Sequence, residues 1–285
     1  MNGIDFIQQR LDSYKVETPL EEDHALREIL QEYILGAFSR TDYFTKASFQ
    51  GGTHLRIFHG LQRFSEDLDF ALLKPDSRFS LKPYLDRAAM ELEALGLSVE
   101  IKDRSKIDNT VKKGFLKDDS LVRLLQLHYP SNWGNRQFPR KLLIKIEVDS
   151  NPPAGATQEA RELRFPFRSS VMNFDLESSF SGKLHAVLCR TYLKGRDWYD
   201  FDWYVSRGVK PNHRLLSAAL DTQGQWAGKR VTTDDDWVRR ELKAKIAEMD
   251  FAAARADVLP FVHPFERPSL DLWSREFFAG LVDRI

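Results

Sequence analysis

The stretch from Gln50 to Phe70 constrains the fold of this 285-residue chain more than any other. Gly51 and Gly52 follow an extended-looking run and stand directly before a short helical pattern. Glycine lets backbone N–H groups approach an anion closely at the start of a helix. Thr53 can cap that helix or donate its hydroxyl group. The stretch therefore predicts a strand, a phosphate-binding turn and a helix in succession.

Two aspartates, Asp67 and Asp69, follow in a second strand-like segment. Alternate side chains of a strand point to one face, so the two carboxylates share a face and lie about 6.5 Å apart along the chain. A later run, residues 141–149, alternates in the same way and places Glu147 and Asp149 on its polar face. The pattern leaves open which of these two carboxylates joins the aspartate pair.

The composition is that of a globular protein, with 42% hydrophobic, 12% aromatic and 29% charged residues. No apolar run approaches the roughly 20 residues that a membrane-spanning helix needs. Residues 1–15 form a polar, amphipathic segment unlike a signal peptide, so we expect a cytoplasmic protein. The single cysteine, Cys189, excludes an internal disulfide and a multi-cysteine zinc site. We expect it to be a buried apolar residue in a helix.

Charge is balanced over the whole chain, with 42 basic and 42 acidic residues. Only the central third, residues 101–175, is basic, with 14 Lys and Arg against 9 Asp and Glu. Such an excess could attract phosphates, or it could be an ordinary solvated surface. The overall charge therefore does not by itself indicate a nucleic-acid partner.

The predicted secondary structure changes near residue 175, from mixed strands and helices to helices alone. We expect an α+β fold with a mixed sheet and flanking helices over residues 1–174 and a helical domain over residues 175–285. The expected strands are 44–50, 68–73, 97–102, 121–129, 141–149 and 161–165, with a loop at 132–140. The expected helices are 21–38, 53–61, 80–95, 176–192, 196–206, 213–220, 234–249, 251–259 and 269–285.

Two or three carboxylates that converge beside a glycine-rich turn repel one another unless a cation or a proton neutralises them. Mg²⁺, or Mn²⁺ in its place, suits such a site because it prefers oxygen ligands and takes the remainder from water and substrate phosphates. Two such ions can activate an attacking hydroxyl and stabilise the leaving oxygen of an in-line phosphoryl displacement. Each signal alone is common on solvated strands and plain turns, but their combination predicts a nucleotidyl-transfer site that uses an NTP.

Several motifs together resemble the AbiEii/AbiGii-type nucleotidyltransferase toxins, close to the MenT toxins, of the DNA polymerase β-like nucleotidyltransferase superfamily. The resemblance covers about residues 44–205. The matching motifs are Gly51-Gly52-Thr53, Arg63-Phe64-Ser65-Glu66-Asp67-Leu68-Asp69-Phe70, Ile144-Lys145-Ile146-Glu147, Lys183-Leu184-His185-Ala186 and Arg196-Asp197-Trp198-Tyr199-Asp200.

The resemblance implies that Asp67 and Asp69 bind the metal, with Glu147 as the third carboxylate or Asp149 in its place. It also implies that a set of residues around the turn binds the nucleotide. This set comprises Gly51, Gly52, Thr53, Arg63 and Ser65. The residues alone leave open whether Arg63 orients the strand that follows it or contacts phosphate.

In the helical half, the resemblance implies that Lys183 lies near the nucleotide phosphates and that Asp200, or Asp197, is an acidic residue of the site. Lys183 could instead be a surface lysine, and Asp197 could form a plain ion pair with Arg196. Four aromatic residues nearby could stack a base, but core packing is favoured. These are Trp198, Tyr199, Trp203 and Tyr204. His54 and His59 are expected at the surface or behind the site, because no other histidine has metal-ligand spacing with them.

By this resemblance we expect a metal-dependent enzyme that transfers a nucleotide from an NTP to RNA and releases pyrophosphate. The expected acceptor is the 3′ acceptor end of tRNA, and the expected context is a toxin–antitoxin or phage-defence system with a cognate antitoxin. One alternative keeps the chemistry and changes the acceptor to a protein or a small molecule. Another is a non-catalytic protein that binds a nucleotide and acts through a partner.

Overall fold

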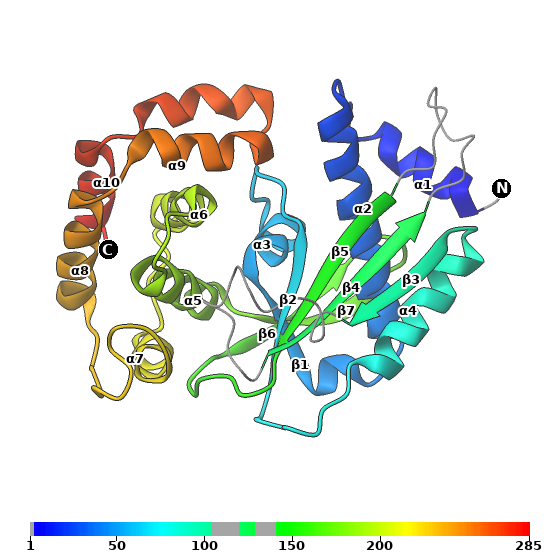
Figure 1. Cartoon of the computed structure of the whole chain (residues 1–285), viewed down its shortest axis with the longest axis horizontal. Helices are drawn as coiled ribbons and strands as arrows, with labels where there is room; N and C mark the ends of the chain where they lie inside the picture. The colour runs from blue at the N-terminus through cyan, green and yellow to red at the C-terminus, as the bar shows by residue number, and fades with distance from the viewer. Residues whose placement is uncertain (1–2, 104–119, 129–140) are drawn as a thin grey trace. The chain divides into compact units, whose positions relative to one another are not determined.

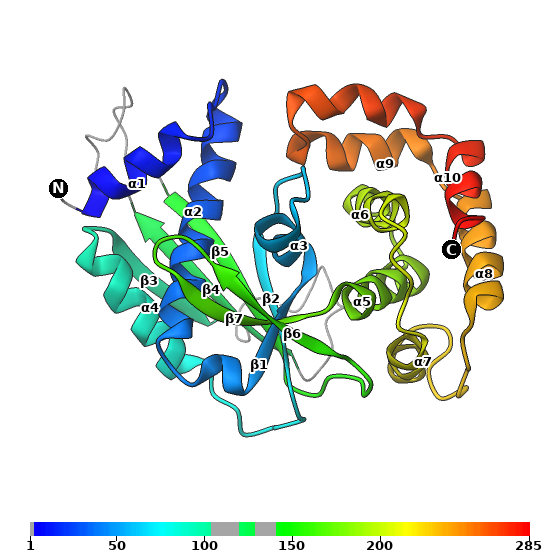
Figure 2. The same cartoon turned by 180° about the vertical axis from the view of Figure 1, so that it is seen from behind.

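The computed structural model describes residues 3–103, 120–128 and 141–285, and it divides the chain into two compact units (Figures 1 and 2). Unit 1 consists of Met1–His59, Phe64–Pro152 and Ala160–Asn173. Unit 2 consists of Gly60–Arg63, Pro153–Glu159 and Phe174–Ile285, so it takes two short segments from before residue 175. The loop expected at 132–140 and much of the basic central third lie outside the described residues.

A seven-stranded mixed sheet forms the centre of unit 1, in the order β3-β4-β5-β2-β1-β7-β6. The strands are β1 (Ala47–Gln50), β2 (Asp67–Leu72), β3 (Ser98–Asp103), β4 (Ser120–His128), β5 (Lys141–Asp149), β6 (Gln158–Leu163) and β7 (Ser169–Phe174). Strand β1 pairs antiparallel with β2, as expected, whereas β2 and β5 are parallel neighbours. The sheet and its flanking helices confirm the α+β fold.

The described residues of unit 1 form four α-helices: α1 (Gly3–Asp12), α2 (Pro19–Ser39), α3 (Gly51–His59) and α4 (Lys82–Ala94). Helix α2 begins at a capping box. The Thr18 side chain accepts the backbone N–H of Glu21, and the Glu21 side chain accepts the backbone N–H of Thr18. The apolar side chains of α2 are buried in the core against the sheet, and α1 and α4 pack against α2. The expected helices at 21–38 and 80–95 are confirmed within two residues.

The two faces of the central strands differ in polarity, as the alternation predicts. Apolar side chains of β2 and β5, such as Phe70 and Ile146, join the core with α1, α2 and α4. The opposite face carries Asp67, Asp69 and Glu147, all of them half-buried. The helix layer on one face therefore fixes which side chains of β2 and β5 remain accessible on the other.

Two features of this half differ from expectation. Residues 44 and 45, expected to begin the first strand, lie in a 3₁₀ turn, Tyr43–Thr45, whose buried tyrosine packs against Phe38 and Phe70. Strand β7 was not expected, and it pairs in parallel with β1 through Phe49 and Asn173. Only three of its six residues are buried, so its hydrophobic signal is weak.

Unit 2 is helical, as expected for the second half. Its α-helices are α5 (Leu176–Cys189), α6 (Gly195–Ser206), α7 (His213–Thr222), α8 (Asp235–Ala247), α9 (Phe251–Val258) and α10 (Arg275–Val282). Five of them begin at a side-chain cap that accepts the N–H three residues on, which explains why they start there. The caps are Asp175, Asn212, Asp234, Asp250 and Ser274.

The single helix expected at 269–285 is wrong, because the segment forms a 3₁₀ helix, Pro264–Leu272, and then α10. Trp198, Trp203 and Tyr204 are buried, which confirms core packing, and Tyr199 is half-buried. Cys189 is a buried free cysteine at the end of α5, as expected.

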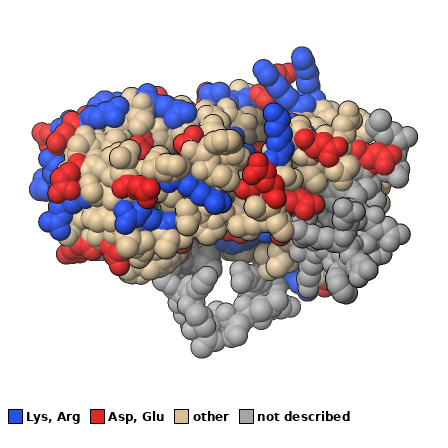
Figure 3. Space-filling model, turned by 90° about the horizontal axis from the view of Figure 1, so that it is seen from above, with Lys and Arg blue, Asp and Glu red and all other residues tan. Residues whose placement is uncertain are grey.

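None of the helices in the described ranges is both long and apolar enough to cross a membrane. On the face seen in Figure 3, basic and acidic side chains are interspersed rather than gathered into one basic area.

Candidate active site

The glycine turn lies directly beside the second aspartate. Gln50, the last residue of β1, is the register partner of Asp69 on β2, and Gly51 follows it with a φ of 83°. A Cβ atom on Gly51 would overlap the Asp69 carboxylate and lie 3.1 Å from the Cβ of Asp69. Residue 51 must therefore be glycine for two reasons, its backbone conformation and the space that Asp69 occupies.

Thr53 ties the turn to the first aspartate. Helix α3 begins at Gly51, so Thr53 lies inside its first turn and is not the capping residue that the sequence allowed for. Its buried hydroxyl donates to the carbonyl oxygen of Asp67, 2.5 Å away. The backbone N–H groups of the first turn have no carbonyl partner within α3. They are the groups of this turn that could bind an anion, together with the positive end of the helix dipole.

The parallel pairing of β2 and β5 brings a third carboxylate beside the pair. Asp69 is the register partner of Glu147. Asp149 is the partner of Ala71, two residues farther along the strand from Asp67. The Asp149 carboxylate also accepts the backbone N–H of Asn151 at 3.0 Å. Neighbouring strands lie about 4.8 Å apart, so Asp69 and Glu147 are adjacent side chains on one face.

A lysine shares this face with the carboxylates. Lys145 is the register partner of Asp67, and its Nζ lies 2.5 Å from Oε2 of Glu147. Burial lowers the pKa of Lys145, but Glu147, Asp67 and Asp69 together raise it above its ordinary value. The ammonium group therefore stays charged.

The fit of a divalent metal ion can be judged from these residues. In the described part of the chain, no three Asp, Glu, His or Cys side chains are already arranged as a metal site. The donors nevertheless suit Mg²⁺ or Mn²⁺ in kind, because they are carboxylate oxygens that project from adjacent strands. The Lys145 ammonium at Glu147 shows that this face already holds a positive charge.

Ser65 lies in the segment that leads into β2. Its carbonyl oxygen accepts a hydrogen bond from Nε2 of Gln31 at 3.3 Å, and the next residue, Glu66, forms an ion pair with Arg27 at 3.4 Å. These contacts join the segment to helix α2. They fix the start of the strand that carries the aspartates.

Arg63 belongs to unit 2, where it forms a buried bidentate ion pair with Asp200. Its Nε and Nη2 each lie 2.6 Å from a carboxylate oxygen of Asp200. The side chains are 3% and 0% exposed. The guanidinium group is therefore used inside unit 2, and Arg63 holds Asp200 in place.

Lys183 and Arg190 extend this pair into a network. The Nζ of Lys183 lies 2.8 Å from carboxylate oxygens of both Asp197 and Asp200, and Nε of Arg190 lies 3.1 Å from Asp197. Lys183 is therefore not a surface lysine. Asp197 and Asp200 face it together because they stand three residues apart on α6, about one helical turn.

Electrostatics keep the network charged. Burial alone would raise the pKa of Asp200, but Arg63 and Lys183 lower it below its ordinary value. Burial likewise opposes ionisation of Asp197, and Lys183, Lys194 and Arg190 lower its pKa by more than burial raises it. The pKa of Lys183 is raised by the same two aspartates, despite its burial. The three cations in direct contact exceed the two aspartates in number.

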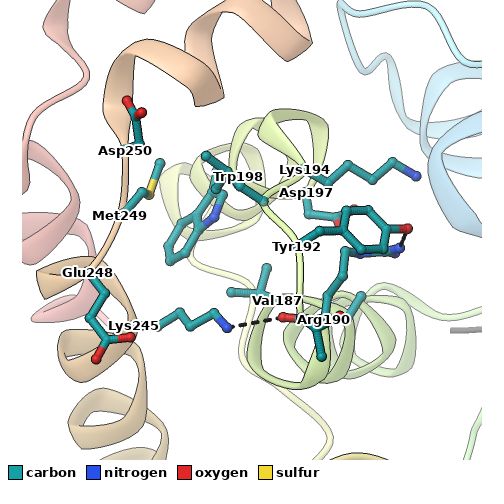
Figure 4. A pocket seen from close by; sticks show the side chains of 13 residues that line it. Val187, Arg190, Tyr192, Lys194, Asp197, Trp198, Lys245, Glu248, Met249 and Asp250 are labelled. Carbon is teal, nitrogen blue, oxygen red and sulfur yellow. Dashed lines mark hydrogen bonds and ion pairs between the residues drawn. The ribbon is translucent and has the colours of Figure 1, made fainter. Parts of the chain in front are cut away.

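A pocket of about 250 Å³ opens beside this network in unit 2 (Figure 4). Trp198, Met249 and Val187 supply apolar walls, and the Nζ of Lys245 donates to the carbonyl oxygen of Arg190 at 3.1 Å. Asp197 is the one residue of the ion-pair network besides Arg190 that lines it. None of the carboxylates on β2 and β5 belongs to its lining.

The two histidines of α3 differ in burial. His54 is fully buried rather than at the surface, next to the ring of Phe49. Burial and the neighbouring His59, whose Nε2 is 3.1 Å from that of His54, lower the pKa of His54 well below its ordinary value. His54 is thus a neutral residue of the interior behind the glycine turn.

Two residues of these clusters were given no role from the sequence. Lys145 occurs in a motif, and its position two residues before Glu147 on a strand could have placed it on the carboxylate face. Arg190 lies at the end of α5 seven residues from Asp197, and no spacing rule would have joined them.

Sequence comparison identifies the family of the chain. Residues 33–276 match the family described as nucleotidyl transferase AbiEii toxin, type IV TA system. The chain therefore belongs to the AbiEii family, and it is a nucleotidyltransferase toxin of a toxin–antitoxin system.

Two solved structures are similar to the chain. One, from H. pylori, is assigned as a nucleotidyltransferase; it is 19% identical, with a TM-score of 0.48, and the match covers 90% of this chain and 89% of that one. The other, JHP933 from Helicobacter pylori, is 17% identical with a TM-score of 0.48, over 91% and 88% of the two chains. No curated protein matches this sequence closely enough to be counted as a relative.

Proposed function

We propose that this toxin transfers a nucleotide from an NTP to the 3′ acceptor end of tRNA in a reaction that depends on Mg²⁺ or Mn²⁺. The observation that carries the proposal is the adjacency of Asp67, Asp69 and Glu147 beside the Gly51 turn. That arrangement combines an anion-binding helix start with oxygen donors for a divalent ion. The tRNA acceptor rests on the resemblance to MenT-like toxins.

In the proposed site, Asp67, Asp69 and Glu147 hold the divalent ion. Asp149 is the weaker candidate for third ligand, because it is paired with Ala71 and accepts the N–H of Asn151. A bound divalent ion supplies positive charge to the α-phosphate and lowers the pKa of the attacking hydroxyl.

The transfer step assigns distinct tasks to the chain's own groups. The N–H groups of Gly52 and Thr53 at the start of α3 bind the phosphates that leave as pyrophosphate. Glu147 accepts the proton of the acceptor hydroxyl at its carboxylate. The hydroxyl oxygen bonds to the α-phosphorus as the bond from that phosphorus to pyrophosphate breaks.

Lys183 and Asp200 remain proposed catalytic residues of the second unit. The two aspartates that contact Lys183 hold its ammonium group in one place and keep it charged. Arg63 acts through Asp200, as a positioning residue, rather than by direct contact with phosphate. The network has more cations than anions, which supports a role beside a phosphate group.

The proposed partners follow from the family and the chemistry. A type IV toxin–antitoxin family supports a cognate antitoxin as partner. NTP and RNA are the proposed substrates, and because both are found in the cytoplasm we propose that the toxin acts there.

The test is transfer of label from each of four α-³²P-labelled NTPs to total RNA in the presence of Mg²⁺. We expect label in the tRNA fraction with the native chain, and none after EDTA treatment or with Asp69→Asn. Label on protein or on a small molecule would contradict the RNA acceptor. The absence of any transfer, at equal folded protein, would contradict the reaction itself.

A further inference from the structure

The polar face of β5 carries a cation where the proposed site needs one. Lys145 and Glu147 stand two residues apart on the strand, so their side chains leave the same face. The Nζ of Lys145 lies 2.5 Å from Glu147, and both side chains are 23% exposed. Most of their surface is thus withdrawn from water, which strengthens the attraction between them.

Lys145 also faces the aspartate pair across the parallel ladder. It is the register partner of Asp67, and Asp69 is the partner of Glu147, so the four side chains form one block on adjacent strands. Its ammonium group contacts Glu147 directly, and the register places Lys145 beside Asp67 on the neighbouring strand. A single ammonium group therefore offsets part of the repulsion among three carboxylates.

We propose that Lys145 is the resident counter-ion of the carboxylates Asp67, Asp69 and Glu147. Its ammonium group holds these carboxylates together in the absence of metal, and a divalent ion replaces it at Glu147 when the ion binds. The inference rests on the proposed function, because it assigns a task at the same site. The lysine stem has four flexible carbons, so its ammonium group can move aside while the backbone of β5 stays fixed. Lys145 is a positioning residue, since it acts through Glu147.

The proposal predicts the sign of an effect on metal affinity. A lysine that only shaped the site would weaken metal binding when removed. A resident counter-ion competes with the metal, so its removal strengthens binding. A unit charge about 6 Å from a divalent ion changes the affinity about tenfold even at the dielectric constant of water.

The experiment measures Mn²⁺ binding by electron paramagnetic resonance, without NTP or RNA, for the native chain and for Lys145→Met, Lys145→Arg and Lys102→Met. Lys102 is a matched control, because it also pairs with a glutamate two residues away on a strand of the same sheet, Glu100 at 3.4 Å. Thermal unfolding in EDTA is recorded for each protein, with and without added Mn²⁺.

We expect Lys145→Met to bind Mn²⁺ about tenfold more tightly, to unfold at a lower temperature in EDTA and to regain more stability from Mn²⁺ than the native chain. Lys145→Arg, which keeps the charge, and Lys102→Met should bind as the native chain does. Unchanged or weaker binding by folded Lys145→Met would overturn the inference. If Mn²⁺ binding by the native chain is absent or survives Asp69→Asn, the metal site itself is wrong and the inference falls with it.

Discussion

Replacing Arg63 with methionine removes the guanidinium group that neutralises Asp200 while keeping much of the side-chain volume. The pair is almost fully buried, and both of its hydrogen bonds are 2.6 Å long. Loss of one partner of a buried ion pair costs about 3–5 kcal/mol, because the other charge stays buried without compensation. Lys183 still contacts Asp200 at 2.8 Å, so we expect the lower end of this range, about 3 kcal/mol.

Urea denaturation followed by tryptophan fluorescence measures this effect in the right part of the molecule. All tryptophans in the described residues belong to unit 2, and the sixth, Trp133, lies outside them. They are Trp198, Trp203, Trp226, Trp237 and Trp273. The matched control is Lys243→Met, which breaks an exposed ion pair with Asp283 in the same unit. The control should change the free energy of unfolding by less than about 1 kcal/mol.

A second variant separates the ion pair from general packing. Replacing Arg63 and Asp200 together by Met and Leu removes both charges, so it should cost less than Arg63→Met alone. If Arg63→Met lowers the free energy of unfolding no more than the Lys243→Met control does, the assigned network is wrong. A variant of full stability that instead raises the KM for NTP would return Arg63 to direct phosphate binding.

Three further results are expected. The lowered pKa values of Asp197 and Asp200 add stability to the folded chain. This stability is fully present above 3.8, the pKa of aspartate in the unfolded chain, and is lost as the pH falls below that value. Urea midpoints that stay constant down to pH 2.5 would argue against this. Burial raises the pKa of Glu32 to about 7 from 4.5, so its ionisation destabilises the fold as the pH rises through that range, and Glu32→Gln should gain about 3 kcal/mol relative to the native chain between pH 4.5 and pH 8, measured by circular dichroism in urea. Gly51→Ala and Gly60→Ala should each lower the free energy of unfolding by about 1–3 kcal/mol, because both glycines have positive φ. Only Gly51→Ala should abolish label transfer, since nothing lies within 4 Å of a Cβ on Gly60. Equal activity of the two variants would contradict the role of the turn.

The sequence predicts β5 at the bounds that the structure has, because residues 144–149 alternate strictly between apolar and polar and give a strong period-two signal. That alternation puts Glu147 and Asp149 on one face without distinguishing them. The register between parallel strands is set by the packing of the whole sheet, so only the structure pairs Glu147 with Asp69. Strand β7 escapes prediction because it is short and half polar.

The unit 2 network shows a second limit of sequence reasoning. Arg63 lies in the same motif as Asp69, and this proximity suggested a shared task. The ion pair with Asp200 instead spans 137 residues, and no local pattern contains such a contact. The partners of Lys183 are also hidden from the sequence, because its two aspartates contact it only when α5 and α6 pack together.

The most direct test of the proposed site compares Glu147→Gln with Asp149→Asn in single-turnover label transfer from α-³²P NTP. Both variants neutralise one carboxylate on the same face of the same strand, and only Glu147 stands in register with Asp69. We expect Glu147→Gln to lose at least about a hundredfold in rate, because a general base contributes about 10²–10⁴-fold, while Asp149→Asn stays within about threefold of the native chain. A larger loss for Asp149→Asn than for Glu147→Gln would contradict the site built on the pairing of Asp69 with Glu147.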